Sequence, residues 1–210
     1  MAAATEAPPP EVHQHTPPPP APPPPQIAAQ RDQWPQDLSE FAAWWLSEPT
    51  LDGGQVAGRI APRGPNGARL MVLVDQPESG DTHSLLAGEQ GRMVGAILAA
   101  LGIDPEQTYF ASLLPRHTPM ADWAALGEAG LGELALHHIA LAAPQRVISF
   151  GPHVSSLLGH DRTKSPDPLQ QFYHVGASIP ALAAPGLNTL MARPRGKAVL
   201  WQALLDWQTP

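Results

Sequence analysis

The segment LMVLVD, residues 70–75, places five apolar residues in a row directly before a carboxylate. An uninterrupted apolar run of this length predicts a strand that is buried on both faces, as in a parallel sheet. Residues 88–101 follow with an apolar stripe at helical spacing, and Gly102 supplies a stop signal after it. The segment therefore predicts the start of an α/β fold.

The same order of elements recurs toward the C-terminus. Further strands are expected at 109–114, 146–150 and around 179–183, and further helices at 131–143, 151–159 and 196–207. This alternation predicts a three-layer α/β/α domain with a central, mostly parallel four-stranded sheet. Ligands of such sheets bind beyond the carboxyl ends of the strands. The corresponding segments here are 75–80, 114–119, 151–155 and 184–188.

The N-terminal part of the chain differs in composition from the rest. Prolines crowd its first 30 residues, so we interpret residues 1–34 as an extended, disordered arm. Apolar residues at helical spacing from Leu38 to Trp45 predict a short docking helix, which is followed by a Gly-rich loop. The expected organisation is thus an arm (1–34), a docking helix with its loop (35–65) and an α/β domain (66–210).

Composition excludes several classes of chemistry. The chain contains no cysteine, so it has no disulfides and no Cys-ligated zinc or iron–sulfur cluster. His137 and His138 are adjacent on an expected helix and cannot converge on one ion, so we expect no metal and no cofactor. The sequence shows neither a secretory signal nor a membrane span, which favours a cytoplasmic protein without a membrane partner.

Charge is distributed unevenly along the chain. The net charge of −7 argues against a generic nucleic-acid binder, because neutralising phosphates requires Lys and Arg. The region 141–210, however, contains 6 basic and 3 acidic residues, whereas 1–140 contains 6 basic and 16 acidic ones. A surface that contacts DNA would therefore be built mainly from the C-terminal third, although ordinary solvated surface explains the same pattern.

Six segments follow one another at defined spacing: VDQPE (74–78), LLAGEQGRMV (85–94), GI (102–103), ASLLP (111–115), PQRVISFG (144–151) and GLNTLMARPRGK (186–197). Their order resembles the uracil-DNA glycosylase superfamily, especially its iron–sulfur-containing bacterial and archaeal branch. The resemblance covers about two-thirds of the chain and rests on order and spacing more than on catalytic identities. It implies the same α/β/α fold and a role in base-excision DNA repair.

The resemblance also implies roles for individual residues. Family members flip a uracil nucleotide into a pocket and stabilise the charged sugar as the base departs. Asp75 takes the place of the family's carboxylate, Leu86 that of its base-stacking aromatic residue, Ser112 that of its base-reading Asn, and Gly186 that of its histidine. The implied catalytic residue is Asp75, and the implied base pocket comprises Gln76, Pro77, Leu86, Ser112, Gly186 and Asn188.

Each of these residues also has a purely structural interpretation. Asp75 could cap the next turn, as short acidic residues often do. Leu86 is typical of a hydrophobic core, and Ser112 of a hydrogen-bonded strand residue. His117 could approach the cleft from another strand end, or lie on the surface.

Anchoring residues match the family better than the chemical ones. Gly151 and His153 open a helix after a buried strand, where free amides favour a phosphate. Arg193, Arg195 and Lys197 lie in the segment that approaches DNA in the family, so we assign this group to the DNA backbone; solvated surface charge is the alternative. The third and fourth cluster positions of the iron–sulfur branch correspond to Arg116 and Leu131. We expect the Trp44–Trp45 helix to pack where the cluster would tie the N-terminus down.

Two functions remain open from the sequence. The first is a divergent uracil-DNA-glycosylase-like protein that binds single-stranded or uracil-containing DNA, or a flipped base, with weak, altered or lost hydrolysis of the N-glycosidic bond. The second is a non-catalytic interaction module that recruits a protein partner through its Pro-rich arm. Loss of several catalytic side chains favours the second for chemistry, whereas the basic C-terminal third favours the first for DNA binding.

Overall fold

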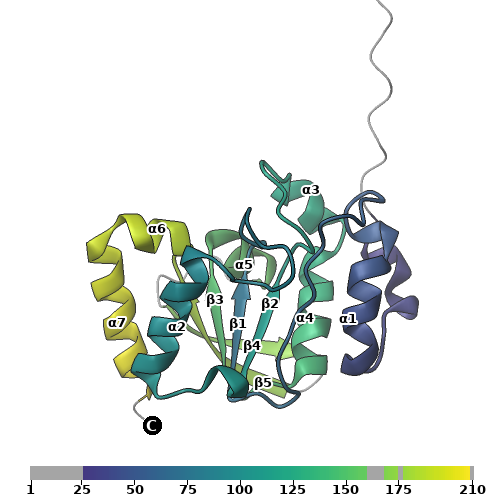
Figure 1. Ribbon diagram of the computed structural model, residues 1–210. Coiled ribbons are helices and arrows are strands. Elements are labelled where there is room, and N and C mark those ends of the chain that lie inside the picture. The colour runs from purple at the N-terminus through teal and green to yellow at the C-terminus, as the bar shows by residue number, and fades with distance from the viewer. Residues whose placement is uncertain (1–25, 160–167, 175–176, 209–210) are drawn as a thin grey trace, which may run out of the picture.

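A computed structural model describes residues 26–159, 168–174 and 177–208 (Figure 1). Its centre is a five-stranded sheet in the order β2-β1-β3-β5-β4. The strands are β1 (Leu70–Val74), β2 (Thr108–Ser112), β3 (Val147–Phe150), β4 (Leu169–His174) and β5 (Ala177–Ala184). β2, β1, β3 and β5 are parallel, and β4 pairs antiparallel with β5. The expected mostly parallel α/β sheet is confirmed, and β4 adds an antiparallel strand to the four expected ones.

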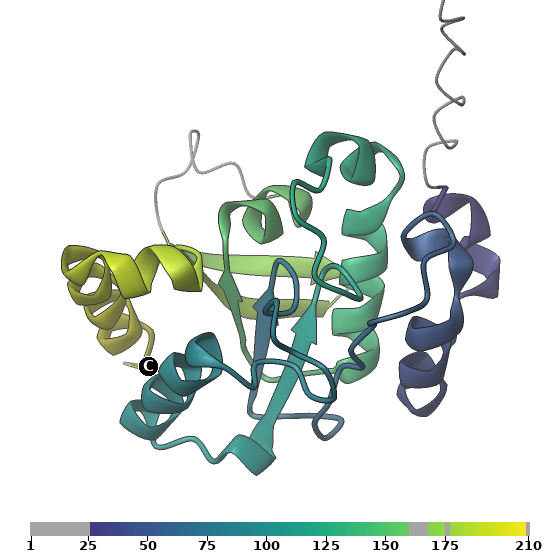
Figure 2. The ribbon, with the colours of Figure 1, turned by 45° about the horizontal axis from the view of Figure 1, so that its top comes forward.

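Helices cover both faces of this sheet, as the two views in Figures 1 and 2 show. One face carries α2 (Glu89–Leu101), α6 (Leu187–Ala192) and α7 (Pro194–Gln208), and the other carries α4 (Leu131–Ala142). Two short helices, α3 (Trp123–Glu128) and α5 (Pro152–Leu157), follow β2 and β3. The three-layer α/β/α class is therefore also confirmed.

Because successive side chains of a strand point to opposite faces of the sheet, the domain has one hydrophobic core on each face. Met71 and Leu73 of β1 point to the α4 face, whereas Leu70, Val72 and Val74 point to the α2 and α7 face. All five residues are buried, because helices cover both sides of the strand. The uninterrupted apolar run in the sequence is the direct consequence of this double coverage.

The N-terminal segment packs on the outer side of α4 (Figure 1). It comprises η1 (Ala28–Gln33), α1 (Leu38–Ser47) and η2 (Pro49–Leu51). Asp37 caps α1 by accepting from the Ser39 N–H, and Phe41 stacks on His138 of α4 with ring centroids 4.0 Å apart. The expected docking helix therefore contacts the domain through an aromatic pair.

The boundary expected for the Pro-rich arm needs a correction. Residues 26–34, which we assigned to a disordered arm, include Ile27 at 0% exposure and a buried Trp34. The Ala28 N–H also donates to the Ala129 oxygen at 2.8 Å. These apolar side chains bury enough surface to order the backbone, which the proline count alone did not reveal. The rest of the arm, residues 1–25, lies outside the described residues.

A single carboxylate fixes the loop that follows α1. Asp52 accepts from Arg59 and from Arg116, each at 2.6 Å, and the Arg59 side chain is only 1% exposed. Arg59 also donates to the carbonyl oxygens of Trp45, Glu48 and Gln55. Of the two residues that the resemblance aligned with cluster ligands, Arg116 joins this network, and Leu131 is buried in the core that contains Trp45.

After this loop, the chain runs along the outer edge of β2. Arg63 and Phe110 exchange two backbone hydrogen bonds, of 3.0 and 2.7 Å, as an isolated antiparallel bridge. The Arg63 guanidinium lies 4.2 Å from the centre of the Phe110 ring. Gly64 is required next to this bridge, because a β-carbon there would collide with the backbone of Thr108 and Tyr109.

Several elements were not expected from the sequence. They are the edge strand β4, the short helices α3 and α6, and the 3-10 turns η1, η2 and η3 (Pro105–Gln107). Among the helices in the described part of the chain, none is both long and apolar enough to cross a bilayer.

Candidate ligand pocket

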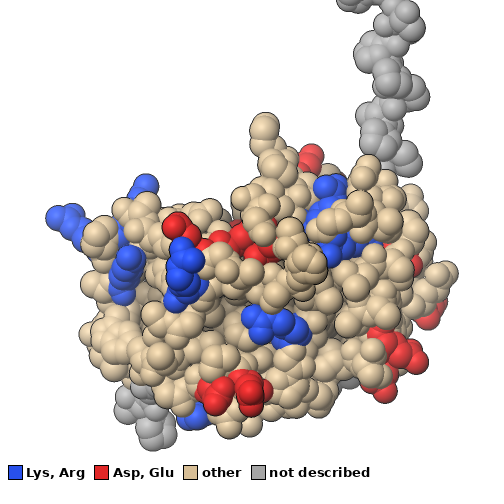
Figure 3. Space-filling model, viewed as in Figure 1, with Lys and Arg blue, Asp and Glu red and all other residues tan. Residues whose placement is uncertain are grey.

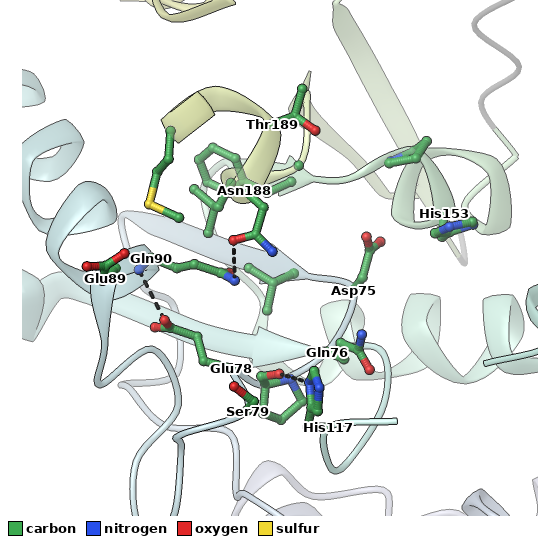
Figure 4. A pocket seen from close by; sticks show the side chains of 17 residues that line it. Asp75, Gln76, Glu78, Ser79, Glu89, Gln90, His117, His153, Asn188 and Thr189 are labelled. Atoms are coloured by element: carbon green, nitrogen blue, oxygen red, sulfur yellow. Dashed lines mark hydrogen bonds between the residues drawn. The ribbon is translucent and has the colours of Figure 1, made fainter. Parts of the chain in front are cut away.

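A pocket of about 520 Å³ opens at the carboxyl ends of the parallel strands (Figure 4). Asp75 comes from the end of β1, His117 from the loop after β2, His153 from the start of α5 after β3, and Asn188 from α6 after β5. Four strand-end segments were expected to meet here. Three of them contribute lining residues: 75–80, 151–155 and 184–188. The fourth, 114–119, contributes His117.

One oxygen of the Asp75 carboxylate accepts a hydrogen bond from a neighbouring helix. Its Oδ1 accepts from the backbone N–H of Val154 in the first turn of α5, at 3.2 Å. Burial raises the pKa of the Asp75 carboxyl to about 6, and this hydrogen bond opposes that rise. Asp75 therefore caps the first turn of α5, and not the turn that follows it in the chain, and it also lines the pocket.

Glu78 occupies the N-terminus of α2. Its two carboxylate oxygens accept from the backbone N–H groups of Gly88, Gln90 and Gly91, at 3.0 to 3.2 Å. Asp81 supports the same loop by accepting from Glu78, Leu86 and Ala87. The Glu78 carboxylate thus replaces the side-chain cap that Gly88 cannot provide at the start of this helix.

His117 and Gln76 link the loops after β1 and β2. The His117 Nδ1 lies 3.1 Å from the carbonyl oxygen of Pro77. Because a carbonyl only accepts, Nδ1 carries the proton, and Nε2 is the acceptor in the neutral ring. Gln76 Oε1 accepts from the Thr118 N–H at 2.7 Å, so its NH₂ group retains its donors.

A hydrogen bond between two amides spans the pocket wall from α2 to α6. Gln90 Nε2 donates to Asn188 Oδ1 at 3.1 Å (Figure 4). Asn188 is exposed in the first turn of α6, shortly after β5, so its NH₂ group can face a ligand. No pattern in the sequence marks Gln90, which belongs to a helix expected only to pack against the sheet.

Two aromatic contacts lie around the pocket. Phe150, the last residue of β3, is buried and lines the pocket. His153 stacks on Trp123 of α3, with centroids 4.5 Å apart and planes 9° apart, and burial lowers its pKa. Sequence reasoning missed Phe150 as a pocket residue, since it reads as the end of a core strand.

The other residues expected in the base pocket separate into two groups. Gln76, Pro77, Gly186 and Asn188 line the pocket together with Asp75. Leu86 and Ser112 are not among the lining residues: Leu86 belongs to the core on the α2 face, and the Ser112 hydroxyl donates to the Leu114 oxygen at 2.7 Å. Their structural interpretations, a core leucine and a hydrogen-bonded strand residue, agree with these contacts.

The residues expected to contact a DNA backbone are also divided. Gly151 has a φ of +117°, and the helix start that it precedes holds the Asp75 carboxylate where we expected a phosphate. Arg193, Arg195 and Lys197 are exposed around the start of α7, and Lys197 faces an apolar groove between α2 and α7. Figure 3 shows blue side chains on this shoulder of the molecule and red ones in the neighbouring hollow.

The charge of the pocket lining is negative. Asp75, Glu78 and Glu89 line it, and none of the lining residues is Lys or Arg. Within the described ranges, no group of three or more His, Cys, Asp or Glu side chains is arranged to hold a metal ion. The arrangement therefore offers hydrogen-bond donors, acceptors and negative charge.

Comparison with known proteins identifies no relative: no family model matches the sequence, and no curated protein matches it either.

Proposed function

We propose that this protein is a divergent relative of the uracil-DNA glycosylase superfamily whose pocket binds one nucleobase, with hydrolysis of the N-glycosidic bond weak, altered or lost. The observation that carries the proposal is the pocket itself, where Asp75, His117 and Asn188 arrive from three different strand ends. The six segments that resemble the family support it further.

The side chains around the pocket suit a nucleobase. Gln76 and Asn188 retain amide N–H donors, whereas Asp75 and the neutral His117 ring offer acceptors. The ring of Phe150 adds an aromatic surface. A flat ring that carries both carbonyl and N–H groups complements such a set, because its edge needs donors and acceptors at once.

Weak or absent hydrolysis follows from what surrounds Asp75. A carboxylate beside the sugar could orient water or stabilise positive charge, and Asp75 Oδ2 is the oxygen that Val154 leaves available. Position 186 is glycine, so no side chain there can donate to the departing base. One of the two catalytic duties therefore lacks its residue.

Binding to single-stranded DNA with and without one uracil, measured over a salt series, tests the proposal. We expect the uracil strand to bind more tightly and log affinity to fall with log salt, since the phosphates would contact the Arg193 and Arg195 shoulder. Base release by the parent and by Asp75→Ala, with Asp32→Ala as a surface control, then separates catalysis from binding. Equal affinity for both strands, with no binding of any free base, would reject a base pocket.

A non-catalytic interaction module is the second candidate. The acidic lining of the pocket favours it, because carboxylates repel a polyanion. In this role the α/β domain is a rigid platform and the Pro-rich residues 1–25 recruit a protein partner. Retention of a partner by the full chain, but not by a chain that begins at Gln26, would support this function.

A further inference from the structure

We infer that the pocket accepts an unphosphorylated nucleobase or nucleoside and rejects the corresponding nucleotide. This inference rests on the proposed function and adds the chemical class of the ligand. It follows from the carboxylates that occupy two of the three helix starts at the pocket, and from the charges on the rim.

The first helix start is that of α2. Helix N-termini bind phosphate because their free N–H groups and the helix dipole favour negative charge. Here the Glu78 carboxylate already accepts from Gly88, Gln90 and Gly91. A phosphate would have to displace a carboxylate that is attached to the chain and held at three amides.

The second helix start is that of α5. The Val154 N–H donates to Asp75, so an incoming phosphate would meet a carboxylate here as well. α5 has only six residues, and its dipole can offset little of that repulsion. Two of the three helix starts at the pocket are therefore held by carboxylates. The third, that of α6, has no side-chain cap, but this helix also has only six residues and a weak dipole.

The rim adds a third carboxylate. Glu89 lines the pocket and contacts Arg92 at 3.4 Å, although both side chains are mostly exposed, so the pair is weak. Arg92 itself lines the groove between α2 and α7, not the pocket. Among the described residues, the cation that pairs with the pocket carboxylate Glu89 therefore lies outside the pocket lining.

A base or nucleoside meets no such barrier. The amide donors of Gln76 and Asn188, the acceptors of Asp75 and His117 and the Phe150 ring need no charge on the ligand. The labelled side chains in Figure 4 surround one common space, with Asn188 on one side and Asp75, Gln76 and His117 along the other. Uncharged hydrogen-bonding rings are the ligands that this combination selects.

Titration calorimetry of the full chain with four nucleosides (uridine, cytidine, adenosine and guanosine), their free bases and their 5′-monophosphates tests the inference. We expect at least one nucleoside or base to bind, and its monophosphate to bind at least about tenfold more weakly, a difference of about 1.4 kcal/mol. A monophosphate that binds as tightly as its nucleoside, or more tightly, overturns this inference and leaves the proposed function standing. If no member of the panel binds, the proposed function fails as well.

Glu78→Gln provides the matched variant, because glutamine keeps an acceptor oxygen for the α2 amides and removes the charge. It should raise the affinity for the monophosphate several-fold relative to that for the nucleoside, whereas Glu40→Gln at an exposed position of α1 should change neither affinity. If the variant does not fold, added salt in the parent should narrow the gap between nucleoside and monophosphate, since it screens the repulsion. A difference in affinity between nucleoside and monophosphate that neither the variant nor salt reduces would contradict repulsion by the carboxylates as its cause.

Discussion

The Asp75 carboxylate lies directly over the α-carbon of Gly151, in the space that a β-carbon would fill. Gly151 has a φ of +117°, a backbone conformation that residues with side chains rarely adopt. The contact brings the ends of β1 and β3 together and sets Asp75 beside the first turn of α5. Glycine at position 151 is therefore a condition for the position of the pocket carboxylate.

Gly151→Ala should accordingly unfold at lower denaturant concentration than the parent. Both the left-handed backbone and the collision with Asp75 cost free energy, and together we expect a loss of about 2–4 kcal/mol. Gly95→Ala is the matched control, because Gly95 is exposed within α2 with open space around it. That control should gain up to about 1 kcal/mol, and a similar loss in both variants would contradict the role of Gly151.

The Asp75 carboxyl should make stability depend on pH in a defined direction. Burial raises its pKa in the folded protein to about 6, above the ordinary 3.8, so the folded chain binds this proton more strongly than the unfolded chain. The resulting stabilisation is present below about pH 4, decreases as the pH rises, and is lost above about pH 6. Its size is on the order of 1–3 kcal/mol.

Asp75→Asn isolates this effect, because an amide oxygen can still accept from Val154. Urea unfolding from pH 4 to 8 should show the variant gaining stability relative to the parent as the pH rises through about 6. Comparison of the two chains cancels the contribution of His153, whose pKa is lowered by burial. A difference in unfolding free energy that stays constant over this range would show that Asp75 keeps an ordinary pKa.

The buried hydrogen bond between Tyr109 and His138 should stabilise the core beside α1, whose Phe41 stacks on His138. Their side chains lie 2.9 Å apart, and burial, with the neighbouring His137, lowers the pKa of His138 to about 3. Tyr109→Phe or His138→Phe alone should each cost about 1–3 kcal/mol, because each leaves the other polar group unpaired. The double variant should cost less than the sum of the two, as measured by urea unfolding. Simple additivity would mean that the hydrogen bond contributes nothing.

Substitution of Asp52, in the loop after α1, should lower the free energy of unfolding strongly. Asp52→Asn removes the charge partner of Arg59, whose guanidinium is buried, and we expect a loss of about 3 kcal/mol in a denaturant titration. Glu133→Gln breaks the exposed pair with Arg31 and should cost less than about 1 kcal/mol. Equal losses in the two variants would argue against a burial effect at Asp52.

Most of the fold was predictable because its signals are local. The run from Leu70 to Val74 and the stop at Gly102 mark β1 and the end of α2 without reference to the rest of the chain. β4 was missed because it pairs only at the edge of the sheet, where no continuous apolar run is needed. The ordering of residues 26–34 was missed because it depends on contacts of Ile27 and Trp34 with distant residues.

The candidate site was predictable in position but not in detail. Parallel topology alone places Asp75 and Asn188 at the same end of the sheet. The roles of Glu78 and Gln90 depend on how a loop folds back over the start of α2, and no spacing in the sequence reports that. Ser112 was expected at the pocket because it takes the place of the family's base-reading Asn, yet its hydroxyl donates to the Leu114 oxygen.

The segment that runs along the outer edge of β2 also protects the protein from self-association. An edge strand with unpaired backbone groups can recruit an extended segment of another chain and start aggregation. At Phe110, both backbone groups are already paired with Arg63, and the close approach at Gly64 leaves no room for a competing chain to slide in. A substitution that lifts residues 60–64 from this edge should therefore promote self-association before it unfolds the domain.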